Sequence, residues 1–168
     1  IFMLIFIHKE AVQSFFEDEN SKKLLATYFT SVLATAKSSE ILASVGSVVK
    51  RLPIDESFVS LLTELGFFKN LSFIVGRYAE DVQVVQSCLS FLGSVSKVSF
   101  SQDFLLFVEP LVRLLALKNE SSKPAIVVIA ELSRFKELAL GFKKMNLVPY
   151  YTQLLKTKFK PVAASFLR

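Results

Sequence analysis

Residues 81–92 have the sequence DVQVVQSCLSFL, which predicts an amphipathic helix that begins at Asp81. Its apolar residues follow at helical spacing, and the same apolar positions recur 40 residues before and after this stretch. Leu52, Leu92 and Leu132 form one such column. Four further columns share this spacing: Val49, Leu89 and Ile129; Phe68, Val108 and Val148; Ile74, Leu114 and Leu154; Val75, Leu115 and Leu155. A fixed period of this length is typical of stacked repeats, whose units bury an apolar face only against their neighbours.

Each period is expected to contain three helices, as the region 39–79 illustrates. Its first helix must end before Pro53, because proline breaks a helix interior. Asp55 or Ser57 is expected to cap a short helix, and Gly66 supplies the turn before an apolar helix.

Three local features are expected in the later periods. Residues 93–97, Gly-Ser-Val-Ser-Lys, have weak helix propensity and are expected to fray or turn. Ser99 or Ser101 is expected to cap the next short helix. Asn146 takes the place of Gly66, an exchange expected at a left-handed helix end.

Composition supports an all-α fold. Hydrophobic residues make up 52% of the 168 residues, and 17 of them are Phe, with no Trp. Five Gly and five Pro favour long helices with short connections over a turn-rich β architecture. We expect one helical repeat domain over residues 1–168, cut from a longer array, since both ends stop part-way through a helix. The approximate units are residues 1–37, 38–79, 80–118, 119–158 and a partial unit, 159–168.

A short helix that ends in Gly or Asn, an apolar helix that closes on a Leu-Leu-type pair, and a longer helix after an acidic start resemble the armadillo repeat. The clearest matches are GFFKNLSFIV at 66–75, NLVPYYTQLL at 146–155 and the stretch 81–92. The resemblance implies a right-handed α-solenoid, an armadillo-like superhelix of about four repeats. HEAT repeats, with two helices per unit, are the alternative at the level of the fold; the recurring short middle helices favour armadillo.

The armadillo resemblance also implies a binding groove lined by the third helix of each unit. Peptide-binding members place Trp there and Asn four residues later, but this chain has Lys50, Ser90 and Ala130 in the first column and Ile54, Ser94 and Arg134 in the second. Capture of an extended peptide in that manner is therefore not expected. The neighbouring groove columns are Ala43, Gln83 and Lys123, and Gly46, Gln86 and Ile126.

Exposed residues on the ridge of this groove are the expected contacts with a partner. They are Lys50, Gln83, Gln86, Ser90, Lys123 and Arg134. Arg134 is the strongest of them, because arginine is enriched at interface hot spots and can donate two hydrogen bonds to a carboxylate.

Residues that could carry catalysis or bind a metal are sparse. With one cysteine, Cys88, and one histidine, His8, the chain can form neither an internal disulfide nor a Cys/His metal site. Cys88 belongs to an apolar column and is expected to be a buried thiol. The acidic runs 17–19 and 80–81 lie at expected helix boundaries, where acids complement the helix dipole. We therefore expect a chain that is not an enzyme and has no catalytic, cofactor or metal site.

The net charge of +5 is spread along the chain. The densest basic positions, Lys22–Lys23, Lys143–Lys144 and Lys156 to Lys160, are expected to be solvated helix ends, so no nucleic-acid partner is expected. The apolar start, Ile1–Ile7, is far too short to span a bilayer. Binding of the basic segment around Phe159 to an anionic membrane surface is a minor alternative.

These observations favour a non-catalytic protein–protein interaction or scaffold module. The expected partners are a protein of unknown identity and the flanking repeats or domains of a longer chain. The expected location is cytoplasmic, with the nucleus as an alternative intracellular site. A second hypothesis is the regulatory or targeting repeat region of a larger enzyme such as a protein kinase, although the chain has no phosphate loop or catalytic loop of kinase type.

Overall fold

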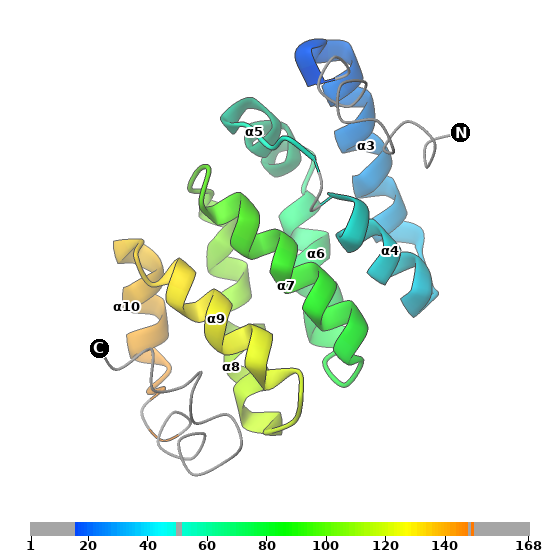
Figure 1. The fold of residues 1–168 in the computed structure, drawn as a ribbon. Coiled ribbons are helices and arrows are strands. Elements are labelled where there is room, and N and C mark those ends of the chain that lie inside the picture. The colour runs from blue at the N-terminus through cyan, green and yellow to red at the C-terminus, as the bar shows by residue number, and fades with distance from the viewer. Residues whose placement is uncertain (1–15, 50–51, 148, 150–168) are drawn as a thin grey trace.

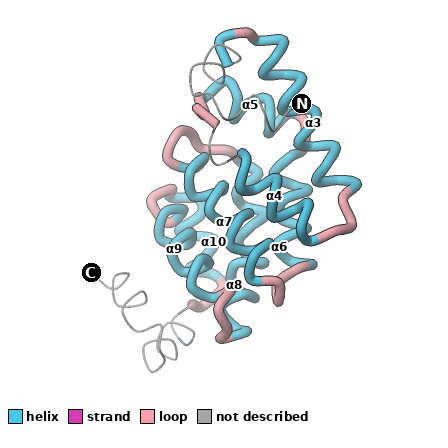
Figure 2. The backbone as a smooth tube through the Cα atoms, turned by 45° about the vertical axis from the view of Figure 1, so that its right-hand side comes forward, coloured by secondary structure: helices cyan, strands magenta, loops and turns pink. Residues whose placement is uncertain are grey.

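The computed structural model describes residues 16–49, 52–147 and 149, and these residues form helices with no strand among them (Figures 1 and 2). The prediction of an all-α fold is confirmed. The elements are α3 (Glu19–Thr35), α4 (Ser39–Val49), α5 (Glu56–Glu64), α6 (Phe67–Arg77), α7 (Val82–Ser96), the 3-10 helix η1 (Gln102–Phe107), α8 (Val108–Leu117), α9 (Ser122–Leu132) and α10 (Lys136–Lys144). The predictions for Ile1–Ile7, His8, Lys50, Val148 and the helix with Leu154 and Leu155 lie outside the described residues, as does the basic segment around Phe159.

Short polar side chains fix where several helices begin. Asp18, Asp55, Asp81 and Ser101 cap α3, α5, α7 and η1, and each accepts a hydrogen bond from a backbone N–H two or three residues later at 2.8–3.2 Å. These bonds satisfy N–H groups that have no partner within the helix. The acidic runs are thus helix caps at Asp18 and Asp81, as predicted.

Left-handed residues end or separate several helices. Gly66 precedes α6 with φ 72°, and Asn146 follows α10 with φ 48°, so the predicted exchange of Gly for Asn is confirmed. Lys118 adopts the same conformation with φ 53° at the end of α8, although a lysine side chain pays a steric cost there.

The prediction that residues 93–97 fray or turn is wrong for residues 93–96, because α7 continues to Ser96 and the turn begins only at Lys97. Val95 and Ser96 are buried, and their packing outweighs the weak helix propensity of the stretch. Ser94 Oγ also donates a hydrogen bond to a backbone carbonyl one turn earlier at 3.0 Å, and so does Ser96 Oγ.

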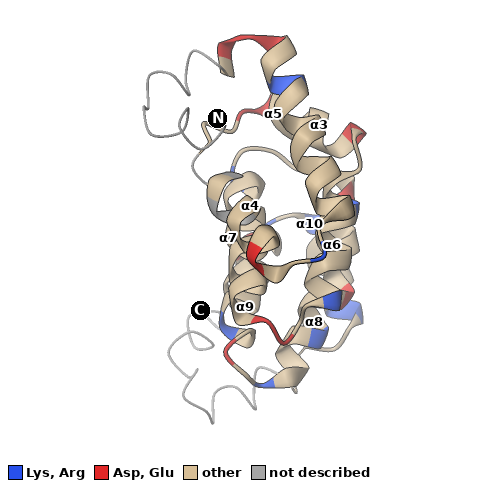
Figure 3. Cartoon of the chain, turned by 90° about the vertical axis from the view of Figure 1, so that its right-hand side faces the viewer, with Lys and Arg blue, Asp and Glu red and all other residues tan. Residues whose placement is uncertain are grey.

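The longer helices lie in two layers. In one layer α7 packs between α4 and α9; in the other α6 packs between α3 and α8. Figure 3 shows the two layers side by side, with α4, α7 and α9 on one side and α3, α6 and α8 on the other. The short elements cover the edges: α5 packs on α3 and α6, η1 on α6 and α8, and α10 on α8 and η1.

The apolar columns fill the space between these layers. Leu52, Leu92 and Leu132 are all buried, which confirms the first column. The described members of the others are buried as well, except the half-buried Val108: Leu89, Ile129, Phe68, Ile74, Leu114, Val75 and Leu115.

Phenylalanine rings connect successive regions of the chain within this core. Phe67 of α6 contacts Phe91 of α7 edge to face, with ring centroids 5.4 Å apart. Phe68 contacts Phe104 of η1 in the same way at 5.1 Å. Two further pairs join other regions: Phe16 and Phe58 at 5.0 Å, and Phe100 and Phe135 at 5.0 Å.

A buried lysine joins α3 to the start of α5. Lys22 Nζ lies 2.8 Å from Asp55 Oδ2, 3.0 Å from Glu19 Oε1 and 2.9 Å from Ser57 Oγ. The prediction that Lys22 is solvated is therefore wrong, whereas Lys23 is exposed. The hydrogen bonds to Asp55 and Glu19 raise the pKa of Lys22. Partial burial raises the pKa of Asp55, but its hydrogen bonds, chiefly the one from Lys22, outweigh this and leave the pKa below its usual value.

We predict that Leu92→Ala and Leu132→Ala each lower the free energy of unfolding by about 2–5 kcal/mol, because each removes a fully buried side chain. Leu140→Ala is the control, since Leu140 is 49% exposed and its loss should cost less than about 0.5 kcal/mol. Urea unfolding measures all three. Near-neutral values for Leu92 and Leu132 would show that the core columns are misassigned.

We also predict a pH-dependent effect of Asp55→Asn, which keeps the helix cap but removes the charge beside Lys22. The folded pKa of Asp55 is lowered, so its contribution to stability is present above the unfolded pKa of about 3.9 and is lost as pH falls through the folded pKa. The difference in urea midpoint between wild type and variant should therefore be largest near neutrality and shrink below about pH 4. A difference that is constant from about pH 7 to pH 3 would contradict this assignment.

Candidate partner-binding site

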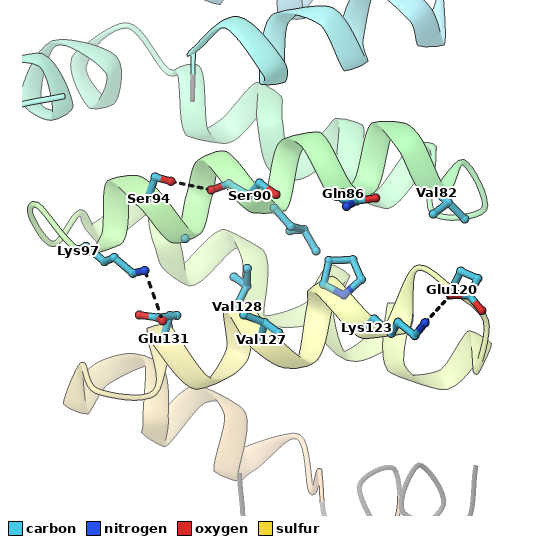
Figure 4. A pocket seen from close by; sticks show the side chains of 13 residues that line it. Val82, Gln86, Ser90, Ser94, Lys97, Glu120, Lys123, Val127, Val128 and Glu131 are labelled. Carbon is cyan, nitrogen blue, oxygen red and sulfur yellow. Dashed lines mark hydrogen bonds and ion pairs between the residues drawn. The ribbon is translucent and has the colours of Figure 1, made fainter. Parts of the chain in front are cut away.

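A hollow of about 550 Å³ lies between α7 and α9 (Figure 4). It follows most of the length of both helices, from Val82 and Glu120 at one end to Lys97 and Glu131 at the other. We call it the α7–α9 groove. Its lining residues are Val82, Gln86, Leu89, Ser90, Gly93, Ser94, Lys97, Glu120, Lys123, Pro124, Val127, Val128 and Glu131.

The floor of the α7–α9 groove is apolar. Leu89 and Val128 form its buried part, and Val127 stands above them with half of its side chain exposed, 50%. Gly93 has no side chain and so leaves space between α7 and α9. A Cβ atom there would lie 3.7 Å from Val128 Cγ2 and fill part of the hollow. An apolar side chain such as Val127 in an open groove is suited to contact with a ligand or a partner.

The α7 wall of the groove is polar. Gln86, Ser90 and Ser94 follow one another along α7 beside the hollow (Figure 4). Ser94 Oγ donates to the backbone carbonyl of Ser90 at 3.0 Å. The Gln86 side chain is exposed and makes no hydrogen bond to other described residues, so its amide is available to an incoming polar group.

Ion pairs lie at both ends of the groove. Lys97 Nζ lies 3.7 Å from Glu131 Oε1 across it, and Lys123 Nζ lies 2.9 Å from Glu120 Oε2. Arg134 approaches Glu131 Oε2 at 4.0 Å. Solvent-exposed pairs of this kind contribute about 0–1 kcal/mol, so a partner could exchange them for its own charges at small cost.

A second hollow, of about 400 Å³, lies between α4 and α7. Gln83, Gln86 and Ser87 line it from α7, and Glu40, Ala43 and Ser44 line it from α4. Gln86 borders both hollows, so the surface formed by α4, α7 and α9 is grooved on each side of α7.

Four of the predicted contacts lie in these hollows: Gln83, Gln86, Ser90 and Lys123. Arg134 lies just beyond the groove, with its guanidinium carbon 4.8 Å from the centroid of the Phe135 ring. Lys50 lies outside the described residues.

In the predicted groove column of Gly46, Gln86 and Ile126, the prediction that Ile126 lines the groove is wrong. Ile126 is fully buried, and Val127 takes the groove position instead. Residues 125–130 are AIVVIA, an unbroken apolar run, so no polar residue in the sequence indicates which side of α9 faces out. Lys97 and Glu131 were missed for another reason: their contact depends on how α7 and α9 pack.

Cys88 is a buried residue of α7, as predicted. Burial raises the pKa of its thiol to about 12, which leaves the reactive thiolate essentially unpopulated near neutrality. Within the described part of the chain, no three His, Cys, Asp or Glu side chains are grouped so that they could hold a metal ion.

Over the same residues, no single helix is long and apolar enough to cross a membrane. Helices α5 and α6 taken together have the length and apolar composition of a membrane span, but the chain bends by 73° between them. Comparison of the chain with known protein families, curated proteins and solved structures finds no match.

We predict that Cys88 in the native protein reacts very slowly with a water-soluble disulfide reagent at about pH 8. The rate should rise as urea unfolds the chain, and one thiol per chain should then react. Absorbance of the released thiolate follows the reaction. Rapid labelling of the folded protein would contradict the buried position of this side chain.

Proposed function

We propose that this chain is a non-catalytic protein–protein interaction or scaffold module that binds its partner in the α7–α9 groove. The observation that carries the proposal is the groove itself: an apolar floor open to solvent at Val127, a polar wall around Gln86, and charged residues at both ends. Partner surfaces that combine an apolar centre with a polar rim fit such a groove.

An armadillo-like α-solenoid of about four repeats is the architecture we propose for this module. The helices of the groove layer, α4, α7 and α9, begin at residues 39, 82 and 122, and the middle helices α6 and α8 begin at 67 and 108. Within each layer these helices pack in order, α4 on α7, α7 on α9, and α6 on α8. The short elements α5, η1 and α10 between them favour three helices per unit over the two of HEAT repeats.

An amphipathic helix of a partner protein is the occupant that the dimensions favour. Helix α7 has 15 residues, so the groove along it is about 22 Å long, the length of a four-turn helix. A helix in this groove would place apolar residues one turn apart against Val127 and Val128. We propose that the partner helix carries an acidic residue at the end that lies near Lys97, because the Lys97 side chain is 61% exposed.

A display library of helix-forming peptides of about 15 residues, selected against the purified 168-residue chain, tests this proposal. Enriched peptides should carry apolar residues at positions i, i+3 or i+4, and i+7. They should bind Val127→Asp at least about tenfold more weakly than wild type, because the carboxylate would be buried without a partner in the complex.

Leu140→Asp is the matched control, because Leu140 is 49% exposed and lies on α10, away from the groove. The enriched peptides should bind this variant as they bind wild type. Equal binding to Val127→Asp would place the interaction on another surface, and the absence of any enriched peptide would contradict an interaction site for helices in this groove.

A further inference from the structure

The face of the α3–α6–α8 layer that points away from the core exposes large apolar side chains. Phe73 of α6 is 66% exposed, more than any other large apolar side chain in the described residues. Leu24 and Tyr28 are exposed one turn apart on α3, and Leu117 is exposed at the end of α8. Because α6 packs between α3 and α8, these side chains belong to one outer surface, which we call the Phe73 face.

The Phe73 face is also basic. Lys69 and Arg77 are exposed one turn before and one turn after Phe73 on the same side of α6. Arg113 and Lys118 are exposed on and after α8.

Acidic residues are nearly absent from the helices that form this face. Residues 20–35 and all of α6 contain none, and the one acid of α8, Glu109, is paired with Arg113 at 2.5 Å. Glu80 and Asp81 follow α6 and line a hollow of about 420 Å³ with Arg77 and Leu117, so acidic side chains border the face at this end. The α7–α9 groove on the other layer differs, because its lysines are matched by Glu120 and Glu131.

We propose that the Phe73 face binds the anionic surface of a lipid membrane, with Phe73 inserted among the lipids. Lys69, Arg77 and Lys118 would lie at the level of the headgroup phosphates and carboxylates, where basic residues are attracted by the negative surface potential. Tyr28 has an apolar ring and a polar hydroxyl, the combination that favours the membrane–water boundary.

The geometry favours a lipid surface over an acidic protein. Phe73 projects from the helix, and an acidic protein would need a preformed pocket to receive it, whereas a lipid surface deforms around an inserted ring. The apolar and basic side chains are also distributed over three neighbouring helices of one layer, which suits a broad surface.

Sedimentation of the purified chain with phosphatidylcholine vesicles, with and without about 30% phosphatidylserine, tests this inference. The protein should partition onto the anionic vesicles and dissociate as salt is raised. Phe73→Ala should lower the partition coefficient about tenfold, and Arg77→Glu should lower it by about tenfold or more.

Each variant has a matched control on the groove layer. Val127→Ala truncates an apolar side chain that is 50% exposed, and Lys97→Glu reverses an exposed charge; both should bind vesicles as wild type does. Circular dichroism verifies that all four variants are folded.

Equal binding to neutral and anionic vesicles, or equal losses in the control variants, would overturn the proposal. Binding to poly-glutamate without binding to anionic vesicles would overturn it as well and assign the face to an acidic protein. None of these results bears on the α7–α9 groove, because the two surfaces belong to different layers.

Discussion

Contacts between phenylalanine rings hold successive regions of this chain against one another. Phe67 and Phe68 of α6 reach in two directions, to Phe91 of α7 and to Phe104 of η1, at centroid distances of 5.4 and 5.1 Å. Such pairs contribute about 0.5–1.5 kcal/mol beyond the area that they bury. The two rings of each pair come from different helices, so enclosing this part of the core requires large side chains supplied by neighbouring regions of the chain. This requirement explains why Phe is so abundant in the sequence.

The two layers have different outer surfaces because the exposed side chains of their central helices, α7 and α6, differ in size. Small side chains, Gly93, Ser90 and Ser94, line α7 where it meets α9, and they leave the hollow that we propose as a partner site. On the outer side of α6, Lys69 and Phe73 are exposed to solvent, and Arg77 lines a separate hollow of about 420 Å³ at the end of the helix. One layer therefore offers a groove with paired charges, and the other offers a basic surface with exposed apolar side chains. Because the two surfaces belong to different layers, both could be occupied at once.

Local sequence predicted the features that depend on local physics. Asp55 and Asp81 cap helices because a carboxylate can reach the free N–H groups of the first turn, and Gly66 and Asn146 tolerate a left-handed backbone. The failures have one cause: they depend on tertiary packing. Lys22 is buried because α5 brings Asp55 to it from 33 residues away. The end of α7 stays helical because Val95 is buried. Which side of α9 faces the core is set by its contacts with neighbouring helices, since residues 125–130 are all apolar and give no indication of it. The sequence therefore predicted polar residues along the groove, such as Gln86 and Lys123, but not the exposed Val127 on its floor.

The central claim is that ring contacts between regions stabilise the fold, and a double-mutant cycle on Phe68 and Phe104 tests it most directly. Both rings are fully buried, meet edge to face, and belong to regions 36 residues apart in the sequence. Phe68→Leu, Phe104→Leu and the double variant would be unfolded in urea, and the account predicts a coupling free energy of about 0.5–1.5 kcal/mol. Strictly additive losses would show that the two rings fill space independently, and would contradict the claim that their contact links the regions.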